Sequence, residues 1–166
     1  TVEEFLAEWN NDSDCVAVHT SGSTGAPKLM MAEKRRMEGS ARMTCKTLGL
    51  SRGDKALVCL PMDYIAGKMM VVRCVTCGLD MMCVEPSGHP LATVNSRIDF
   101  AAMVPMQVFN SLEDDVERQR LMAIGNLLIG GGAIDERLES ALREFPNELV
   151  WHDGDLVAHS LAQARR

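Results

Sequence analysis

A short segment near the start of the chain concentrates side chains that suit a polyphosphate. Residues 19–28 read His-Thr-Ser-Gly-Ser-Thr-Gly-Ala-Pro-Lys. Its donors are the hydroxyls of Thr20, Ser21, Ser23 and Thr24, the backbone N–H groups left bare at Gly22 and Gly25, and the ammonium of Lys28. Phosphate oxygens accept hydrogen bonds from all of these groups, whereas a hydrophobic ligand would need none of them.

This segment differs from a Walker A loop. That loop has four residues between its first glycine and a Gly-Lys-Ser/Thr, and it continues directly into a helix. Here only two residues separate Gly22 from Gly25, and Pro27 precedes Lys28. The run 29–32 favours a short strand, so we expect a phosphate-binding loop between two strands. The alternative is a Ser/Gly turn of a hairpin, since these residues commonly form turns.

The segment 20–28 resembles the signature loop of the adenylate-forming acyl- and aryl-CoA ligase superfamily. Further stretches resemble the O-succinylbenzoate–CoA ligases of menaquinone biosynthesis in their short bacterial form, namely 41–45, 61–70, 86–91, 100–107 and 129–134. The resemblance extends to about Pro146. It implies an AMP-forming acid–thiol ligase that uses ATP, Mg²⁺ and coenzyme A, and whose substrate is a small-molecule carboxylate.

The resemblance also implies roles for individual residues. The phosphates would be bound by Thr20, Ser21, Gly22, Ser23, Thr24, Gly25 and Lys28, with Thr24 and Lys28 catalytic. The wall between the adenine and acyl pockets would be formed by Gly130, Gly131, Gly132 and Ala133. From the residues alone, these glycines could equally form a tight turn between a strand and a helix.

Four residues are candidates for contact with the carboxylate substrate. His19 adjoins residues 20–28, called here the hydroxyl-rich segment, and could orient that segment or touch the substrate. Tyr64 lies in a stretch whose residues contact the acyl substrate in the superfamily that the chain resembles. Lys68 and Arg73 are the only cations of a predicted helix over 65–77. O-succinylbenzoate has a second carboxylate that calls for a cation. The alternative for both cations is a surface position with the charge in water.

The tail matches the superfamily less well. Residues 151–155 read Trp-His-Asp-Gly-Asp, which resembles two superfamily motifs, one that binds Mg²⁺ and one that binds the ribose hydroxyls. Under either motif Asp155 takes a nucleotide role. The catalytic lysine of the superfamily's mobile lid has no counterpart here, so we expect residues 1–166 to be one ATP- and acyl-binding α/β domain without that C-terminal lid.

Composition excludes several classes of protein. The 166-residue chain has a formal charge of −6, which disfavours non-specific binding to nucleic acid. No run approaches the roughly 18 apolar residues of a membrane span, and we expect no secretory leader. Cys74 and Cys77 have the spacing of a zinc or redox pair but lack the further ligands such a site requires. We expect a reduced, cytoplasmic protein, and the sequence leaves a homo-oligomer open.

Apolar runs alternate with amphipathic ones along the chain. Strands are predicted at 15–19, 55–60, 79–84, 100–104, 127–129 and from 148, and helices at 1–9, 33–48, 65–77, from 105, 114–123 and 135–144. The mixed-charge stretch 113–120 is interpreted as a solvated helix face, and the helix over 114–123 is expected to make its apolar contacts through Val116, Leu121 and Met122. This alternation predicts an α/β fold with a mostly parallel sheet covered by helices on both faces.

The favoured function is ligation of coenzyme A to O-succinylbenzoate through an acyl adenylate. One alternative is a different acyl- or aryl-CoA ligase of the same superfamily. A second, from another class, is a nucleotide-binding fragment that catalyses nothing.

Overall fold

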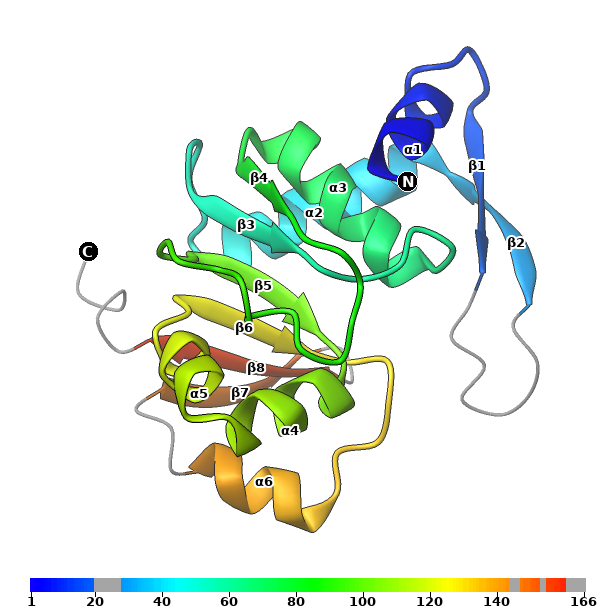
Figure 1. The fold of residues 1–166 in the computed structure, drawn as a ribbon. Coiled ribbons are helices and arrows are strands. Elements are labelled where there is room, and N and C mark those ends of the chain that lie inside the picture. Colours follow the sequence, from blue (N-terminus) through cyan, green and yellow to red (C-terminus); the bar gives the residue numbers. More distant parts are fainter. Residues whose placement is uncertain (20–27, 144–146, 153–154, 161–166) are drawn as a thin grey trace.

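The computed structural model describes residues 1–19 and 28–143, together with the backbone of 147–152 and 155–160. In this part of the chain it contains six helices and eight strands (Figure 1). None of these helices combines the length and the hydropathy that a membrane span needs.

A six-stranded sheet in the order β4-β3-β5-β6-β8-β7 forms the centre of the fold. Its parallel strands are β3 (Lys55–Val58), β4 (Asp80–Cys83), β5 (Phe100–Met103) and β6 (Asn126–Ile129). An antiparallel pair, β7 (Asn147–His152) and β8 (Asp155–Ser160), extends the sheet beyond β6. The prediction of a mostly parallel sheet is confirmed, while the return of the chain as β8 was not predicted.

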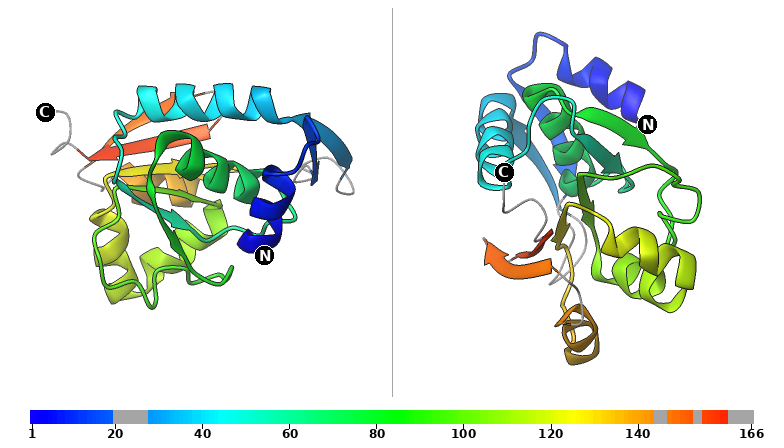
Figure 2. Two further views of the ribbon diagram at one scale, coloured as in Figure 1. Left: turned by 90° about the horizontal axis from the view of Figure 1, so that it is seen from above. Right: turned by 90° about the vertical axis from the view of Figure 1, so that its left-hand side faces the viewer.

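Helices cover both faces of this sheet, as predicted. They are α1 (Val2–Trp9), α2 (Lys34–Thr47), α3 (Ile65–Cys77), α4 (Pro105–Glu113), α5 (Asp115–Met122) and α6 (Glu136–Arg143). α2 and α3 lie on one face, and α4 and α5 lie on the other (Figure 2). α1 begins with a capping box between Thr1 and Glu4.

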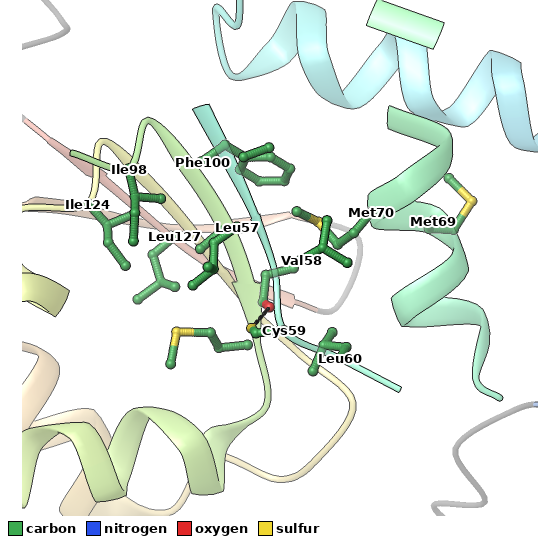
Figure 3. Close-up of a cluster of buried hydrophobic side chains, with 14 of the residues drawn as sticks. Leu57, Val58, Cys59, Leu60, Met69, Met70, Ile98, Phe100, Ile124 and Leu127 are labelled. Atoms are coloured by element: carbon green, nitrogen blue, oxygen red, sulfur yellow. Dashed lines mark hydrogen bonds between the residues drawn. The ribbon is translucent and has the colours of Figure 1, made fainter. Parts of the chain in front are cut away.

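The two faces have separate apolar cores because side chains alternate along each strand. Val58 and Phe100 point toward α3, where Met70 packs against them, whereas Leu57 and Leu127 point toward α4 (Figure 3). All five side chains are at most 2% exposed. These buried contacts pack the helices against the parallel strands, whose carboxyl ends all lie at one end of the sheet.

A separate antiparallel hairpin stands beside the main sheet (Figure 1). Its strands are β1 (Cys15–His19) and β2 (Leu29–Glu33), with His19 paired to Leu29. The prediction of a strand on each side of the hydroxyl-rich segment is therefore confirmed. Residues 20–27 of that segment lie outside the described residues, so its alternative as a plain turn is not decided.

The interpretation of 113–120 as a solvated helix face holds for most of the stretch but is wrong at Glu117. Glu117 is only 3% exposed and accepts hydrogen bonds from neighbouring elements. Val116, expected to make an apolar contact, is 54% exposed. Leu121 is fully buried, as predicted. A charged run at helical spacing therefore concealed one buried carboxylate, which composition could not distinguish from its exposed neighbours.

Candidate active site

An apolar cavity of about 450 Å³ opens at the carboxyl edge of the parallel strands. Its lining comprises Leu60, Pro61, Tyr64, Ile65, Ala66, Pro86, Ser87, Gly88, Val104, Met106, Gln107 and Gly131. These residues follow β3, β4, β5 and β6 or begin α3 and α4. Ligands of open α/β sheets bind at this edge, so the cavity is the candidate site for a small molecule.

Two of the sequence-predicted site residues line this cavity, Tyr64 and Gly131. Tyr64 is the residue before α3, at its N-cap position. Gly131 has φ of +77°, a conformation that other residues adopt only with strain. A Cβ added to Gly132 would lie 3.4 Å from Cδ of Pro105. That distance is an ordinary van der Waals contact, so it is the turn at Gly131 that requires glycine, and the contact of these residues with adenine stays a prediction.

Another glycine lets α3 approach the cavity wall. A Cβ on Gly67 would overlap the backbone carbonyl of Pro61, which lines the cavity. The absence of a side chain at Gly67 thus fixes how closely the first turn of α3 packs on the segment after β3.

His19 connects the hairpin to this cavity. Its N–H donates to the carbonyl oxygen of Asp63 at 3.3 Å, and its ring Nδ1 lies 3.2 Å from the same oxygen. His19 also forms a parallel bridge with Tyr64. The strand that leads into the hydroxyl-rich segment therefore ends beside a cavity-lining residue. Lys28, at the far end of the segment, is exposed just before β2.

The comparison with known families agrees with this arrangement. A family model described as AMP-binding enzyme matches residues 3–152. The chain belongs to the AMP-binding enzyme family. The parallel strands β3, β4, β5 and β6, the cavity and the glycine turn all lie within the matched region.

Curated relatives of this AMP-binding chain carry a more specific name. It is 25% identical over 132 residues to 2-succinylbenzoate–CoA ligase of Geobacillus sp. (strain WCH70), covering 78% of this chain and 27% of the relative. It is also 25% identical over 135 residues to the enzyme of that name from Enterococcus faecalis, covering 80% and 28%. The chain thus spans a little over a quarter of the relatives it matches.

Solved structures of similar proteins share the fold. An acyl-CoA synthetase (AMP-forming)/AMP-acid ligase II-like protein from Dyadobacter fermentans matches with a TM-score of 0.78 and 36% identity, covering 86% of this chain and 41% of that one. O-succinylbenzoate coenzyme A synthetase from Bacillus subtilis, in complex with AMP, matches with a TM-score of 0.60 and 23% identity. That match covers 78% of this chain and 27% of the other, and at such identity it supports the fold alone.

The predicted substrate cation Lys68 has a different position in this AMP-binding fold. Its Nζ donates to Glu8 Oε2 at 3.0 Å and to the carbonyl of Ala17 at 2.7 Å, and it lies 5.0 Å from the ring centre of Phe5. Glu8 Oε1 accepts the N–H of Ala17 at 3.0 Å. The ion pair therefore satisfies both backbone groups of one residue of β1 and ties the hairpin to α1 and α3.

The pKa of Glu8 reflects this contact. Partial burial alone would raise that pKa, but the hydrogen bonds from Lys68 and from the N–H of Ala17, with the nearby positive charge, lower it overall. Glu8 is therefore held as a carboxylate that accepts from both donors.

Arg73 is likewise absent from the cavity lining. It is 9% exposed, its guanidinium lies 5.9 Å from the ring centre of Phe100, and Nη1 lies 3.6 Å from Sδ of Met70. We therefore remove Lys68 and Arg73 from the candidate acyl site. The alternative of surface cations is wrong too, because both side chains are buried.

A second, larger cavity of about 650 Å³ lies beside α1. Among its lining residues are the carboxylates of Glu3, Glu4, Glu8, Asp63 and Glu85. Lys68 is the cationic side chain that faces them. This acidic lining is unsuited to a polyphosphate.

Burial makes three of the described cysteines poor nucleophiles. Burial raises the pKa of the Cys45, Cys59 and Cys74 thiols to about 12. No group of three His, Cys, Asp or Glu side chains among the described residues is placed to hold a metal ion. Asp155 begins β8 opposite His152, and its proposed contact with ribose or magnesium stays a prediction because its side chain is outside the described part.

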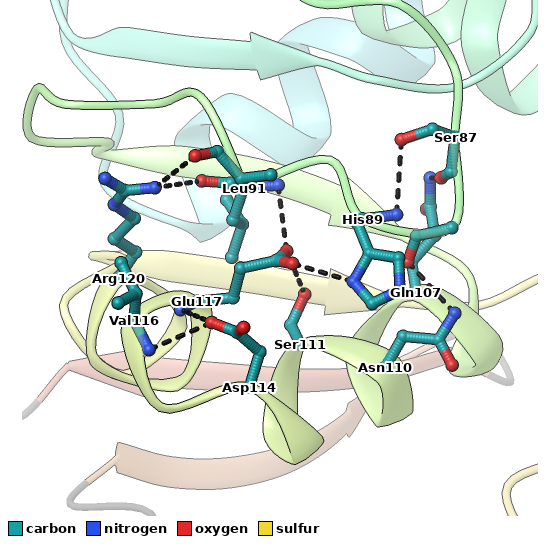
Figure 4. Close-up of polar contacts among 12 residues, drawn as sticks. Ser87, His89, Leu91, Gln107, Asn110, Ser111, Asp114, Val116, Glu117 and Arg120 are labelled. Atoms are coloured by element: carbon teal, nitrogen blue, oxygen red, sulfur yellow. Dashed lines mark hydrogen bonds and ion pairs between the residues drawn. The ribbon is translucent and has the colours of Figure 1, made fainter.

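Sequence reasoning missed a network of buried polar residues that shapes the cavity wall. Gln107 and Asn110 of α4 donate to the carbonyls of Ser87 and Gly88, both of which line the cavity (Figure 4). Behind them, Glu117 accepts from Ser111 Oγ at 3.1 Å. One signal was available, because Gln107 is the third residue of a helix that starts with proline. At that position a Gln side chain can accept the N–H of the residue just before the helix, here Val104.

Proposed function

We propose that this chain is the ATP- and carboxylate-binding portion of an AMP-forming acid–thiol ligase acting on O-succinylbenzoate. The observation that carries the proposal is the apolar cavity at the carboxyl edge of the sheet, beside the strand that leads into residues 20–28. The names of the curated relatives supply the first substrate to test.

The proposed reaction has two steps. A carboxylate oxygen of the substrate attacks the α-phosphorus of ATP, and pyrophosphate leaves with the bridging oxygen. The thiolate of coenzyme A then attacks the acyl carbon of the adenylate, forming the thioester and releasing AMP. Both steps depend on stabilising charge on phosphate oxygens more than on acid–base groups.

Residues of this chain divide between the two substrates in the proposal. Thr20, Ser21, Ser23, Thr24 and Lys28 donate to phosphate oxygens, and Gly22 and Gly25 leave their N–H groups available. The aromatic ring of the carboxylate packs in the cavity against Tyr64 and the apolar side chains beside it. Gly130, Gly131, Gly132 and Ala133 form the wall shared with the adenine.

The phosphate role is tested with the exposed cation Lys28. Calorimetry should show that Lys28→Ala weakens ATP·Mg²⁺ binding about tenfold, as for a lost charge-assisted hydrogen bond. Lys46→Ala, at an exposed position near the end of α2, is the matched control and should bind as the parent does. Equal affinity in both variants, with unchanged melting temperatures, removes Lys28 from the mechanism.

A different acyl- or aryl-CoA ligase is the second candidate, and one observation favours it. The two buried cations of α3 contact Glu8 and Phe100 rather than the cavity. Exchange of labelled pyrophosphate into ATP, driven by O-succinylbenzoate or by benzoate, separates the two candidates. A clear preference for the dicarboxylate supports the first, and faster exchange with the monocarboxylate supports the second.

A further inference from the structure

A single buried amide connects three segments that wall the apolar cavity. Gln107, in the first turn of α4, is 3% exposed. Its Oε1 accepts the N–H of Val104 at 3.1 Å, and its Nε2 donates to the carbonyls of Cys59 at 3.2 Å and Ser87 at 2.8 Å. Both amide hydrogens and the amide oxygen are thus paired within the protein.

The three partners come from different parts of the sheet edge. Cys59 directly follows β3, Ser87 lies after β4, and Val104 directly follows β5. Ser87, Val104 and Gln107 itself line the cavity, as does Leu60 next to Cys59. One side chain, Gln107, therefore bonds to all three segments that form the cavity wall.

A second amide supports the same wall. Asn110, one helical turn beyond Gln107, donates Nδ2 to the carbonyl of Gly88 at 3.1 Å. The space between them is full, because a Cβ on Gly88 would lie 2.8 Å from Nδ2 of Asn110. The segment 86–90 is outside any strand or helix, so its carbonyls depend on side chains for partners.

We propose that Gln107 is a positioning residue for the acyl-binding cavity. Its carboxamide holds the segments after β3, β4 and β5 at the separation that the bound acyl group requires. The identity of that ligand rests on the proposed function, whereas the effect on the walls does not.

Two substitutions separate the acceptor of this amide from its donors. Gln107→Glu keeps an oxygen that accepts the N–H of Val104 but replaces the donor to Cys59 and Ser87 with a second acceptor. Gln107→Met keeps the length of the side chain and removes all three hydrogen bonds. Val108→Ala, which shortens a fully buried apolar side chain on the same helix away from the cavity lining, is the matched control.

The first measurement is backbone hydrogen exchange of the ligand-free full chain. Gln107→Met should speed exchange at Val104, whereas Gln107→Glu and Val108→Ala should leave that amide protected. Both Gln107 variants should speed exchange in the segment 87–91 relative to Val108→Ala. Unchanged exchange there in both variants overturns the proposal, whether or not the chain binds a ligand.

The second measurement is the affinity for the acyl-adenylate analogue OSB-AMS, the ligand of a similar Escherichia coli structure. Gln107→Met should weaken binding on the order of tenfold or more, and Val108→Ala should not. Affinity of Gln107→Glu should recover as the pH falls, because a protonated carboxyl can donate to Ser87 again, whereas the parent should show no such recovery. An equal loss in Val108→Ala, or no recovery in Gln107→Glu, reduces Gln107 to a general packing role.

These outcomes distinguish the proposal from the proposed function. If the parent chain does not bind OSB-AMS or ATP while Gln107→Met opens the wall in hydrogen exchange, the assignment of the ligand fails and the positioning role stands. If the parent binds and neither Gln107 variant changes affinity or exchange, the assignment of the ligand stands and the positioning role fails.

Discussion

Different interactions pack the helices and loops against the two faces of the central sheet. On the face covered by α2 and α3, buried side chains such as Met70, Val58 and Phe100 pack against one another (Figure 3). On the face covered by α4 and α5, apolar packing is joined by a buried polar network that holds the long connection between β4 and β5 (Figure 4). The apolar face joins regular elements, and the polar network holds a segment without regular structure.

The polar network exists because that connection has few hydrogen bonds of its own. Arg120 Nη1 donates to the carbonyls of Leu91 and Ala92, each at 2.7 Å, and Nη2 donates to Asn95 Oδ1 at 2.7 Å. Glu117 accepts from the N–H of Leu91 at 3.2 Å. Side chains therefore supply the partners that a strand or helix would find within its own backbone. The cavity lies where this network meets the sheet edge.

The largest expected effect breaks the apolar face. Phe100→Ala should lower the free energy of unfolding by about 3–5 kcal/mol, because it deletes a fully buried ring and leaves a cavity. Urea denaturation followed by circular dichroism measures this loss. Val116→Ala, at a residue that is 54% exposed, should change stability by less than about 0.5 kcal/mol. A loss below about 1 kcal/mol for Phe100→Ala contradicts its place in the core.

The next effect breaks the polar face. Glu117→Ala should cost on the order of 3 kcal/mol of unfolding free energy, because Ser111, His89 and the N–H of Leu91 lose a charged acceptor. Glu117→Gln should cost less, since it keeps the shape and one acceptor oxygen. Glu113→Ala removes an exposed carboxylate of the same run and is the control. If Glu117→Ala is as mild as Glu113→Ala, the buried network does not stabilise the fold.

A third effect concerns the hairpin, which an ion pair ties to the apolar face. Lys68→Met should cost about 1–3 kcal/mol, because the carbonyl of Ala17 and the carboxylate of Glu8 lose their buried donor. A double-mutant cycle with Glu8→Gln measures the coupling of the pair. Lys46→Met, at an exposed site, is the control. Additive effects of the two substitutions would show that the tether is not cooperative.

A smaller effect sharpens the comparison at the start of α5. Asp114 caps this helix by accepting the N–H groups of Val116 at 3.0 Å and Glu117 at 2.9 Å. Asp114→Ala should therefore lower the unfolding free energy by about 1 kcal/mol, and Asp114→Asn by less. Thermal melts of the two variants measure the difference. Equal melting temperatures for parent and Asp114→Ala would contradict a role for the cap.

The smallest expected effect is the pH dependence of the hairpin tether. Because the folded-state pKa of Glu8 lies below its ordinary value of 4.5, its contribution to stability is present above about pH 4.5 and is lost as the pH falls through the lower folded pKa. The stability difference between the parent and Glu8→Gln should therefore shrink on acidification. Denaturation curves between pH 3 and pH 7 test this sign, and a difference that grows toward acid would reverse it.

Local pattern predicted the regular elements well. The helix at 65–77 was predicted with the bounds that the structure has, because a long apolar run between Pro61 and Gly78 can hardly form anything else in a buried layer. The strand at 15–19 was likewise predicted with its observed bounds. The antiparallel β8 was missed, since its pairing with β6 joins residues about thirty positions apart.

The candidate site was predictable only in part. Tyr64 and Gly131 were found because their motifs are contiguous in the chain, and both line the cavity. Gln107 and Glu117 were missed, and Lys68 was assigned to the substrate, because their partners are distant in sequence. Lys68 contacts Glu8 across 60 positions and Ala17 across 51. The local sequence around a polar residue on a helix does not reveal whether its hydrogen-bond partner is a distant carbonyl, a ligand or water.

The sequence by itself determined where the helices and most of the strands lie, the mostly parallel class of the sheet, and the position of a hydroxyl-rich segment between two strands. These properties follow from hydrophobic periodicity and turn chemistry, which act between neighbours along the chain. Tertiary structure alone decided which polar side chains are buried and what they contact. Burial removes water as a partner, so Gln107, Glu117 and Lys68 each bind the backbone that the fold brings within reach, and that choice shapes the cavity.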